Sequence, residues 1–400
     1  MTTTINNEHK KLNVPNIRFP EFEGEWEKKK LEECVDFLDG LRKPIKSEDR
    51  KSEQGLYPYY GASGIIDYID DFIFDGEYIL LSEDGANIID RNYRVAFIAK
   101  GKIWVNNHAH VLQPYDGFDI NFLSETLERL NYAVYNTGTT MPKLNQEVCR
   151  NINLKIPATK EQNKIGNLLS LLNERIATQN KIIDKLQSLI KGIADNILDN
   201  PLWKKTYLRS FMQFFSTNSL SWEQLSYEEG EIRNLHYGLI HGFFTSGIKS
   251  YSLPMVKYGE MPKQYTLCQV GDVAFADASE DTDEIGKSVE FVDTIKGDTI
   301  CGLHTIHGRD IKNRTVVGFK GFAFNSRYFH NQIKRLAQGT KIFSITANNL
   351  SSCYVYLPDV ETQKVIVKLL KAYEEQLIIS RMTLKQYEKQ KQYLLLQMFI

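Results

Sequence analysis

Two histidine pairs have the spacing that comes closest to a metal site in this chain. One residue separates His108 from His110, and two residues separate His304 from His307. Neither pair is accompanied by a CxxC or HExxH motif, which many zinc sites contain. We therefore favour structural or hydrogen-bonding roles for these histidines over metal binding.

A run of carboxylates in the second half of the chain is a second candidate for metal chemistry. Its members are Asp277, Glu280, Asp281, Asp283 and Glu284. Carboxylate oxygens are ligands for hard divalent cations, so a nuclease with a metal site near Asp277 to Glu290 is one alternative function. A solvated acidic loop is the interpretation we favour.

Motifs for nucleotide or methyl-donor chemistry are missing from the sequence. It contains no GxxxxGK(S/T) phosphate loop, no glycine-rich cofactor loop after a strand and no Asn/Asp-Pro-Pro-aromatic sequence. The last of these is typical of amino-methyltransferases. We expect this chain to hold no catalytic residue, no metal ion and no cofactor of its own.

The composition is that of a folded protein with more than one domain. Four hundred residues exceed an ordinary domain, and 42% hydrophobic and 12% aromatic residues are enough to build cores. The five cysteines are scattered, and no run of 18 apolar residues occurs. These features favour a reducing compartment and no membrane-spanning helix, so we expect a cytoplasmic protein.

The chain contains an internal repeat. Gly138-Thr139 aligns with Gly339-Thr340 at an offset of 201, and without a gap Pro157 then matches Pro358. Near the start of each copy, Trp26 aligns with Trp203 at an offset of only 177. The second copy must therefore carry extra residues in its interior, so the two copies share a frame and differ inside it.

Two long helices are predicted after the two prolines, because apolar residues recur there at alternating spacings of four and three. The first seam is Ile165, Leu169, Leu172, Ile176, Gln179, Ile183 and Leu186, and the second includes Ile366, Leu370, Leu377, Ser380 and Leu384. In an antiparallel pair, the polar members Gln179 and Ser380 would meet near the crossing and fix the register. Two ordinary core helices in separate domains are the alternative.

The helix starts also carry capping signals. Thr159 with Gln162 three positions later fits a capping box, and Asp359 is a candidate cap for the second helix.

Each long helix follows a segment that we interpret as α+β with an irregular sheet. The β-type runs of the first are 57–64, 65–76, 77–87 and 93–105, and those of the second are 236–242, 272–281, 287–293 and 314–324. A helical patch follows in each, at 121–135 and 327–337.

Charge is distributed unevenly between the copies. Residues 1–157 carry 19 basic and 25 acidic side chains, whereas residues 201–358 carry 17 and 15. From Arg309 to Lys341, eight basic residues are interleaved with aromatics, a pattern that suits phosphate contact and base stacking. A solvated basic face over core aromatics is the alternative. The acidic first copy argues against simple electrostatic capture of DNA.

This layout of domain, long helix, domain, long helix resembles the DNA-specificity subunits of Type I restriction–modification enzymes. Similar segments are VPNIRFPEFEGEWEKKKL (14–31), PYYGASGIIDYID (58–70), HYGLIHG (236–242), GTTMPKLN (138–145), GTKIFSIT (339–346) and KIPATKEQNKI (155–165). The resemblance extends from about Pro15 to the C-terminus.

The resemblance implies an α+β fold with five segments. They are an N-terminal extension (1–25), target-recognition domain 1 (26–157), spacer helix 1 (158–200), target-recognition domain 2 (201–358) and spacer helix 2 (359–400). Each domain would read half of a split, asymmetric target on double-stranded DNA. The helices would form an antiparallel coiled coil that sets the spacing and docks two methyltransferase subunits.

In such a complex, motor–nuclease subunits join the methyltransferase core. S-adenosylmethionine, ATP and magnesium are then used by the partners, which agrees with the motifs missing here.

Base-edge contacts require polar side chains on loops, which gives a set of candidate DNA-binding residues. In the first domain they are Tyr60, Ser63, Arg91, Asn92, Asn106 and Lys143, and in the second His236, Tyr237, His241, Arg309, Lys312, Arg314 and Lys341. A coiled-coil adaptor that binds protein only remains a further alternative to DNA recognition.

Overall fold

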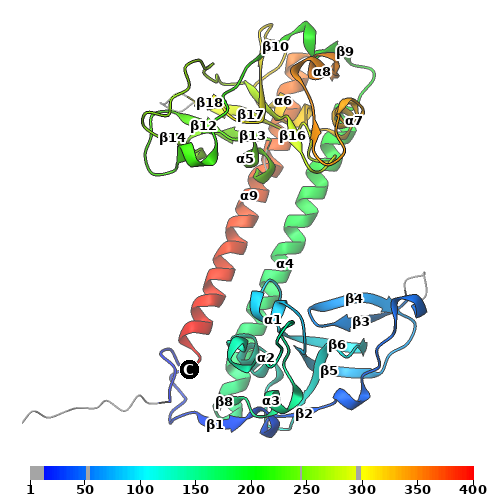
Figure 1. Ribbon diagram of the computed structural model, residues 1–400, viewed down its shortest axis with the longest axis vertical. Helices are drawn as coiled ribbons and strands as arrows, with labels where there is room; N and C mark the ends of the chain where they lie inside the picture. Colours follow the sequence, from blue (N-terminus) through cyan, green and yellow to red (C-terminus); the bar gives the residue numbers. More distant parts are fainter. Residues whose placement is uncertain (1–12, 51–54, 244–245, 294–298) are drawn as a thin grey trace, which may run out of the picture. The chain divides into compact units, whose positions relative to one another are not determined.

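A computed structural model describes residues 13–50, 55–243, 246–293 and 299–400. Residues 1–12 of the predicted N-terminal extension therefore lie outside the described residues. The chain divides into two compact units (Figure 1). Unit 1 comprises Met1–Asn180 with Thr383–Ile400, and unit 2 comprises Lys181–Met382. The predicted spacer helices are thus not separate bodies, because each is divided between the units.

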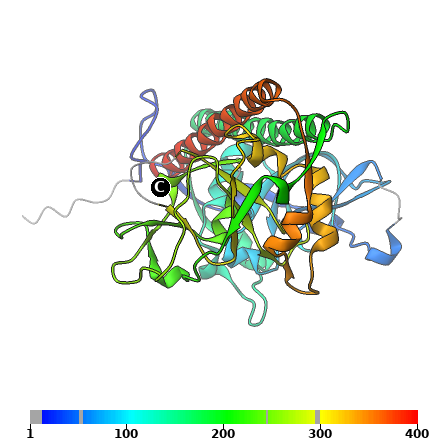
Figure 2. The same cartoon turned by 90° about the horizontal axis from the view of Figure 1, so that it is seen from above.

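Unit 1 is built on a six-stranded sheet with the strand order β2-β7-β5-β6-β3-β4. Its strands are β2 (Val35–Phe37), β3 (Tyr57–Gly61), β4 (Gly64–Ile69), β5 (Phe74–Ser82), β6 (Ala96–Val105) and β7 (Ala109–Pro114). Only the β3–β6 pair is parallel. The β3–β4 hairpin extends beyond the rest of the sheet in both views (Figures 1 and 2).

A separate two-stranded ribbon and short helices complete the first domain. The ribbon pairs β1 (Glu27–Lys30) with β8 (Asn153–Ile156), and the helices are α1 (Asn87–Asp90), α2 (Ile120–Glu128) and α3 (Gln146–Arg150). Both faces of β5 are buried, since Ile79 and Leu81 belong to one apolar cluster and Leu80 to another. This burial explains the uninterrupted apolar run of that strand.

Unit 2 contains the same frame with an added sheet. The main sheet has the order β10-β19-β15-β17-β13, a second sheet has the order β11-β14-β12-β18, and the ribbons β9–β21 and β16–β20 lie apart from both. The strands are β9 (Lys204–Tyr207), β10 (Met212–Phe215), β11 (Leu225–Ser226), β12 (Arg233–Leu235), β13 (Gly247–Lys249), β14 (Met255–Val256), β15 (Val273–Ala276), β16 (Ala278–Ser279), β17 (Ser288–Asp293), β18 (Thr299–Cys301), β19 (Thr305–Asp310), β20 (Phe343–Ser344) and β21 (Tyr354–Leu357).

Strand pairing locates much of the change in repeat offset between β10 and β15. Strand pairing makes Phe214 the counterpart of Phe37, an offset of 177, and Val273 the counterpart of Ile79, an offset of 194. Strands β11, β12 and β14 lie between those two points in the sequence. The structure thus locates most of the predicted interior insertion.

Two predictions of strand structure in the second domain are wrong. Residues 236–242 contain helix α5 (Tyr237–Gly242), and residues 314–324 contain helix α6 (Phe319–Ala323). Every residue of α6 is buried. A short helix that is buried on all sides shows no clear periodicity, so its sequence cannot be distinguished from a buried strand. The remaining short helices are α7 (Arg327–Leu336) and α8 (Ala347–Ser352), which lie beside each other and are drawn in orange tones in Figure 2.

The long helices are α4 (Thr159–Leu198) and α9 (Val360–Gln397). Unit 1 holds the beginning of α4 and the end of α9, whereas unit 2 holds the end of α4 and the beginning of α9. This pairing of opposite ends makes the helices an antiparallel coiled coil, as predicted. Every residue of the two predicted seams is buried or half-buried. Gln179 and Ser380 belong to different units, so their meeting at the crossing stays a prediction.

The two helix starts differ from each other in their caps. Asp359 caps α9, because its Oδ1 accepts a hydrogen bond from Thr362 N at 2.9 Å. The predicted capping box of α4 is wrong. Thr159 is itself the first helical residue and donates its hydroxyl to Gly117 O at 2.8 Å.

Gln162, the other residue of the predicted capping box, has a different role, and Gln363 has the same role in the second copy. Gln162 donates to Pro157 O at 2.9 Å and accepts from a backbone N–H in the preceding loop at 3.1 Å. Gln363 makes the same pair of contacts, donating to Pro358 O at 3.1 Å and accepting from Val316 N at 2.9 Å. Both glutamines are buried, and each fixes its long helix to the domain before it.

The end of each long helix completes an apolar core. In unit 1, the ring of Phe399 stacks on Phe122 at 5.3 Å between ring centroids and lies edge-on to Trp26 at 6.2 Å. In unit 2, Leu198 packs into the core that contains Leu208 and Phe319. Leu198 and Phe399 are separated by the repeat offset of 201, so the two units use equivalent positions to close their cores.

Candidate nucleic-acid interface

Four loops of unit 1 meet at one end of the sheet, and we call the polar residues there the first edge: Tyr60, Asp84, Asn106, His108 and Lys143. Asn106 N donates to Tyr60 O at 3.1 Å, and His108 N donates to Asn106 Oδ1 at 2.8 Å. The His108 Nδ1 atom lies 2.8 Å from Asp84 Oδ1. The loop from the end of β5 and the turn between β6 and β7 are therefore held together.

The loop at residues 138–143 joins the same edge. Gly85 N donates to Pro142 O at 3.1 Å, and Thr137 N donates to Lys143 O at 2.8 Å. A Cβ atom on Gly138 would lie 1.8 Å from Met141 O. Only glycine fits this turn, which explains the glycine that opens the repeated motif.

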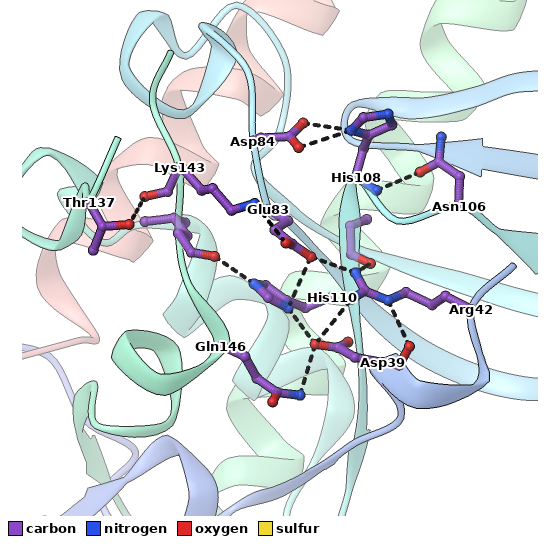
Figure 3. A network of polar contacts seen from close by, with 12 residues as sticks. Asp39, Arg42, Glu83, Asp84, Asn106, His108, His110, Thr137, Lys143 and Gln146 are labelled. Atoms are coloured by element: carbon purple, nitrogen blue, oxygen red, sulfur yellow. Dashed lines mark hydrogen bonds and ion pairs between the residues drawn. The ribbon is translucent and has the colours of Figure 1, made fainter. Parts of the chain in front are cut away.

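A buried ion network supports the first edge from beneath (Figure 3). Glu83 lies at its centre, with Oε1 3.4 Å from Lys143 Nζ and Oε2 2.7 Å from Arg42 NH1. Asp39 Oδ2 lies 2.6 Å from His110 Nδ1, and His110 Nε2 lies 2.8 Å from the carbonyl of Leu144. The surface lysine is thus linked to charges that the fold fixes in place.

His110 is a cation within this network. Burial by itself would lower the pKa of the imidazole, but hydrogen bonding and charge interaction with Asp39 and Cys149 outweigh burial and raise the pKa to about 10. Both ring nitrogens face oxygen acceptors, as expected for an imidazolium that donates from each nitrogen. The hydrogen-bonding role favoured from the sequence is confirmed for His110.

Unit 2 has an equivalent arrangement, and we call its polar residues the second edge: Tyr237, His241, Asp277, His304 and Lys341. Asp277 N donates to His304 O at 3.1 Å, as Glu83 N donates to His108 O at 2.8 Å in unit 1. His304 Nδ1 lies 3.1 Å from Asp277 Oδ1. Each edge therefore presents a half-exposed histidine bonded to a carboxylate.

The glycine loop is repeated at the second edge as well. Ile345 N donates to Asp277 O at 2.9 Å, matching the bond from Leu144 N to Glu83 O at 2.7 Å. A Cβ atom on Gly339 would lie 1.9 Å from Ile342 O. The loop that carries Lys341 thus reaches the second edge by the same backbone route as Lys143 reaches the first.

Aromatic and imidazole rings give the second edge a different surface. The ring centroid of His236 lies 4.4 Å from that of Trp222 and 4.8 Å from that of Tyr237. The Tyr237 ring lies edge-on to His304, with 5.3 Å between the centroids. His236 is only 3% exposed, and burial together with the charge of nearby His304 lowers its pKa. His236 caps α5 by accepting from Gly238 N, so it supports Tyr237 from within.

The structure brings together some of the residues predicted from the sequence and separates others. Tyr60, Asn106 and Lys143 converge on the first edge, and Ser63 lies in the adjoining turn between β3 and β4. Arg91 lies elsewhere, with its guanidinium 3.0 Å from Glu128 Oε1. Asn92 follows it in the chain and is exposed.

The basic candidates of the second domain also fall into two places. His236, Tyr237, His241 and Lys341 lie at or directly under the second edge, whereas Arg309, Lys312 and Arg314 follow β19 away from His304. At about 3.3 Å per residue, five residues along that strand put Arg309 roughly 16 Å from His304. Arg309 donates twice to Asp272, at 2.8 and 2.7 Å.

The aromatic side chains of the basic stretch are mostly internal, whereas most of its basic side chains are exposed. Phe319, Phe322, Phe324 and Phe329 are buried, and the buried Lys320 lies 2.9 Å from Glu290 Oε1. The alternative interpretation, core aromatics beneath basic residues, therefore describes this stretch better than a stacking surface. Sequence spacing alone could not separate the two because both place aromatics between charges.

Three residues of the acidic run bond to lysine or histidine side chains of their own unit. Asp283 contacts Lys334, Glu284 lies 3.0 Å from Lys287 Nζ, and Asp277 bonds His304. Within the described part of the chain, the groups with metal-ligand geometry are Asp39 with Glu83 and His110, and Cys268 with Cys301 and His307. Neither group includes the acidic run, so the structure gives the nuclease alternative no support.

The chain thus contains two α+β domains whose polar edges are built in the same way, and each domain is fixed to the long helix that follows it. The family model of the Type I restriction modification DNA specificity domain matches residues 23–188 and 302–388, which is more than half of the chain. The chain belongs to this family, and it is a DNA-recognition subunit of a type I restriction–modification system.

Individual relatives agree with that assignment. A putative type I restriction enzyme specificity subunit of Haemophilus influenzae is 35% identical over 150 residues, which cover 38% of this chain and 37% of that protein. The MjaVIII type I specificity subunit of Methanocaldococcus jannaschii is 24% identical and covers 94% of this chain and 91% of its own.

Solved structures share the fold. The type I S subunit from M. genitalium has a TM-score of 0.63 at 15% identity and covers 97% of this chain and 99% of its own. A chain from a structure on complex assembly of the type I restriction–modification system has a TM-score of 0.51 at 13% identity, covering 94% and 97%. In the described residues, no helix combines the length and apolar character needed to cross a bilayer.

Proposed function

We propose that each unit reads one half of a split, asymmetric sequence on double-stranded DNA through its own edge. The observation that carries this proposal is the repetition of the edge itself. A glycine-opened loop that carries an exposed lysine and a histidine bonded to a carboxylate recur in both domains, with the glycines and the histidines at equivalent positions. The residues around them differ, which is what two readers of different sequences require.

The long helices set the distance between the two half-sites in this proposal. They also provide the surface to which two methyltransferase subunits bind, and motor–nuclease subunits join that assembly. The chain itself catalyses no reaction. S-adenosylmethionine, ATP and magnesium ions are used by the partner subunits, and the complex works in the cytoplasm, where its DNA substrate lies.

Exposed lysines at the edges supply contacts to DNA phosphates or bases. Lys143 is 46% exposed and is positioned by Glu83, and Lys341 is exposed in the equivalent loop. Each lysine neutralises backbone charge when DNA binds and releases counterions, so its removal lowers both affinity and salt dependence.

The test compares Lys143→Ala and Lys341→Ala with the control Lys100→Ala, in the complex with the methyltransferase subunits. Lys100 lies on β6, is 59% exposed and pairs with Glu77 on β5. Glu77 is about five residues before the end of β5 that leads into the first edge. For each edge variant we expect roughly tenfold weaker binding to DNA. The slope of log affinity against log salt concentration should be smaller by about one. The control should show neither change. Equal behaviour of all three variants would contradict the proposal.

A further inference from the structure

Two cysteines and a histidine of unit 2 come together in the protein interior, away from the second edge. Cys268 precedes β15, Cys301 ends β18 and His307 lies on β19. Their exposed fractions are 8%, 3% and 1%. One potential ligand atom from each residue lies within 4.8 Å of the other two.

The two sulfurs lie within hydrogen-bonding distance of each other, at a spacing close to that of two ligands on one metal ion. Cys268 Sγ and Cys301 Sγ are 3.5 Å apart, and both thiols are free. A disulfide would hold the sulfurs at about 2 Å. Two thiolates each about 2.3 Å from a tetrahedral zinc ion lie roughly 3.8 Å apart. The observed spacing therefore matches shared coordination better than a bond.

His307 is oriented as metal-bound histidines usually are. Its Nε2 lies 2.7 Å from Asp272 Oδ2, and Asp272 is itself bonded twice by Arg309. A carboxylate on one ring nitrogen fixes the ring, an arrangement that is common among metal-bound histidines. The Asp272–Arg309 pair thus supports the histidine from outside the ligand set.

A buried hydroxyl lies on the same face of the small sheet as the two thiols. The bridge between Leu267 and Ile300 places Cys268 opposite Thr299, and Cys301 is two residues further along that strand. Thr299 is 2% exposed, and its Oγ1 has no hydrogen-bond partner among the described residues. A water in the fourth position of a metal ion would give this hydroxyl a partner.

The other group with metal-ligand geometry shows what a closed cluster looks like. Around Asp39, Glu83 and His110, the guanidinium of Arg42 already neutralises the carboxylates, and both nitrogens of His110 face oxygen acceptors. No ring nitrogen remains there for a metal. Cys268, Cys301 and His307 instead offer soft ligand atoms, and no cation lies among these three residues. The two clusters therefore differ in whether a metal ion could find free ligand atoms.

We propose that Cys268, Cys301 and His307 bind one zinc ion inside the second domain. Two thiolates and an imidazole are the donors that a soft, borderline divalent cation prefers. The ion would join the small sheet to the main sheet, because its ligands come from β18, β19 and the segment before β15. This inference departs from the expectation of a metal-free chain and is independent of the proposed function.

Zinc binding requires both thiols to lose their protons. Burial, together with the neighbouring Cys268, raises the pKa of the Cys301 thiol well above its ordinary value. Metal uptake therefore competes with protonation, and loading should weaken as the pH falls.

The first experiment uses the unaltered full-length chain, reduced and incubated with zinc, then freed of excess metal. We expect about one zinc ion per chain by mass spectrometry of the metal. Replacement with cobalt should give the absorption bands of a tetrahedral thiolate complex. Absence of both signals, or a mass that reveals a Cys268–Cys301 disulfide in the reduced sample, would overturn the proposal.

Variants then locate the ion. Cys301→Ser and Cys268→Ser should each retain less than a tenth of the zinc, whereas Cys353→Ser should retain all of it. Cys353 is an equally buried, unpaired thiol in the other core of unit 2, which makes it a matched control. Zinc retained by both ligand variants would assign the metal elsewhere and exclude this site. The cobalt spectrum of the unaltered chain decides the question if a variant does not fold.

Discussion

At the scale of single residues, the first edge depends on charges that the sequence does not reveal as a group. Asp39, Glu83 and His110 are 71 residues apart from first to last, and only the folded sheet brings them together. The sequence did indicate that His110 is a hydrogen-bonding residue, since no metal motif accompanies it. The pairing with Asp39 could not be predicted, because it arises from the contact between β7 and the turn after β2.

The raised pKa of His110 makes the stability of unit 1 depend on pH. The folded pKa is about 10, above the ordinary value of 6.5. The imidazolium therefore stabilises the fold fully below pH 6.5, and this contribution is lost as the pH rises toward 10. Between pH 7 and pH 9 we expect the free energy of unfolding to fall by about 2 kcal/mol.

Denaturant unfolding of the unaltered chain and of His110→Gln at these two pH values measures this dependence. The variant should start less stable at pH 7 and lose little more by pH 9, because it has no proton to lose at this position. His108→Gln serves as the control, since His108 is half exposed at the surface. An equal pH dependence in His110→Gln and the unaltered chain would contradict the assignment of a buried imidazolium.

Residues predicted from the sequence to bind DNA were chosen by type, and type does not show whether a group is already bonded. Tyr60 lies near the end of β3 and Asn106 follows β6, so the pairing of these two strands brings them together. Lys143 joins them on a loop that is hydrogen-bonded to the end of β5. Arg91 and Arg309 have the same chemistry but form ion pairs with Glu128 and Asp272. The partner carboxylates lie 37 residues away in each case, beyond the reach of any local pattern.

At the scale of elements, the long helices were the most predictable part of the chain. A heptad pattern continues through several turns, so errors at single positions do not obscure it. The short helices α5 and α6 were predicted as strands, because a segment of five or six residues is too short to show a helical period, and α6 is also buried throughout. Gln162 and Gln363 show a further limit of prediction from the sequence. A glutamine three residues after a threonine fits a capping box, but the side chain can equally bond the backbone before the helix.

The end of α9 is expected to hold the core of unit 1 together. Phe399 is 5% exposed, stacks on Phe122 and lies beneath the guanidinium of Arg129, 5.1 Å from the ring centroid. Phe399→Ala should lower the stability of unit 1 by about 3–4 kcal/mol, through lost burial and the cavity left behind. Leu396→Ala, at a side chain that is 63% exposed, should change it by less than about 0.5 kcal/mol.

Thermal unfolding of both variants, followed with a probe in each unit, tests this role. The lower transition temperature should be confined to the unit that contains Trp26. A Phe399→Ala chain that unfolds at the same temperature as Leu396→Ala would show that the helix end does not complete the core.

At the scale of the whole molecule, the repeat predicted the architecture because duplicated frames leave duplicated signals. The glycine loop, the proline before the helix and the buried glutamine recur at a constant offset. The interiors could not be predicted to the same degree, since the second domain divides its strands between two sheets, and in the smaller sheet only the parallel β12–β18 pair has a counterpart, β3–β6, in the first domain. The interior of each domain is also the part that must determine which DNA sequence the domain prefers.

The central claim is that each unit reads one half of the target, and the methylated sites in a host genome test it most directly. Cells would carry the full system with either the unaltered chain or a chain whose residues 201–358 come from another specificity subunit. The account predicts a bipartite motif with a fixed spacer, in which the exchange changes one half and leaves the other half and the spacer unchanged. A motif that changes in both halves, or in neither, would contradict it.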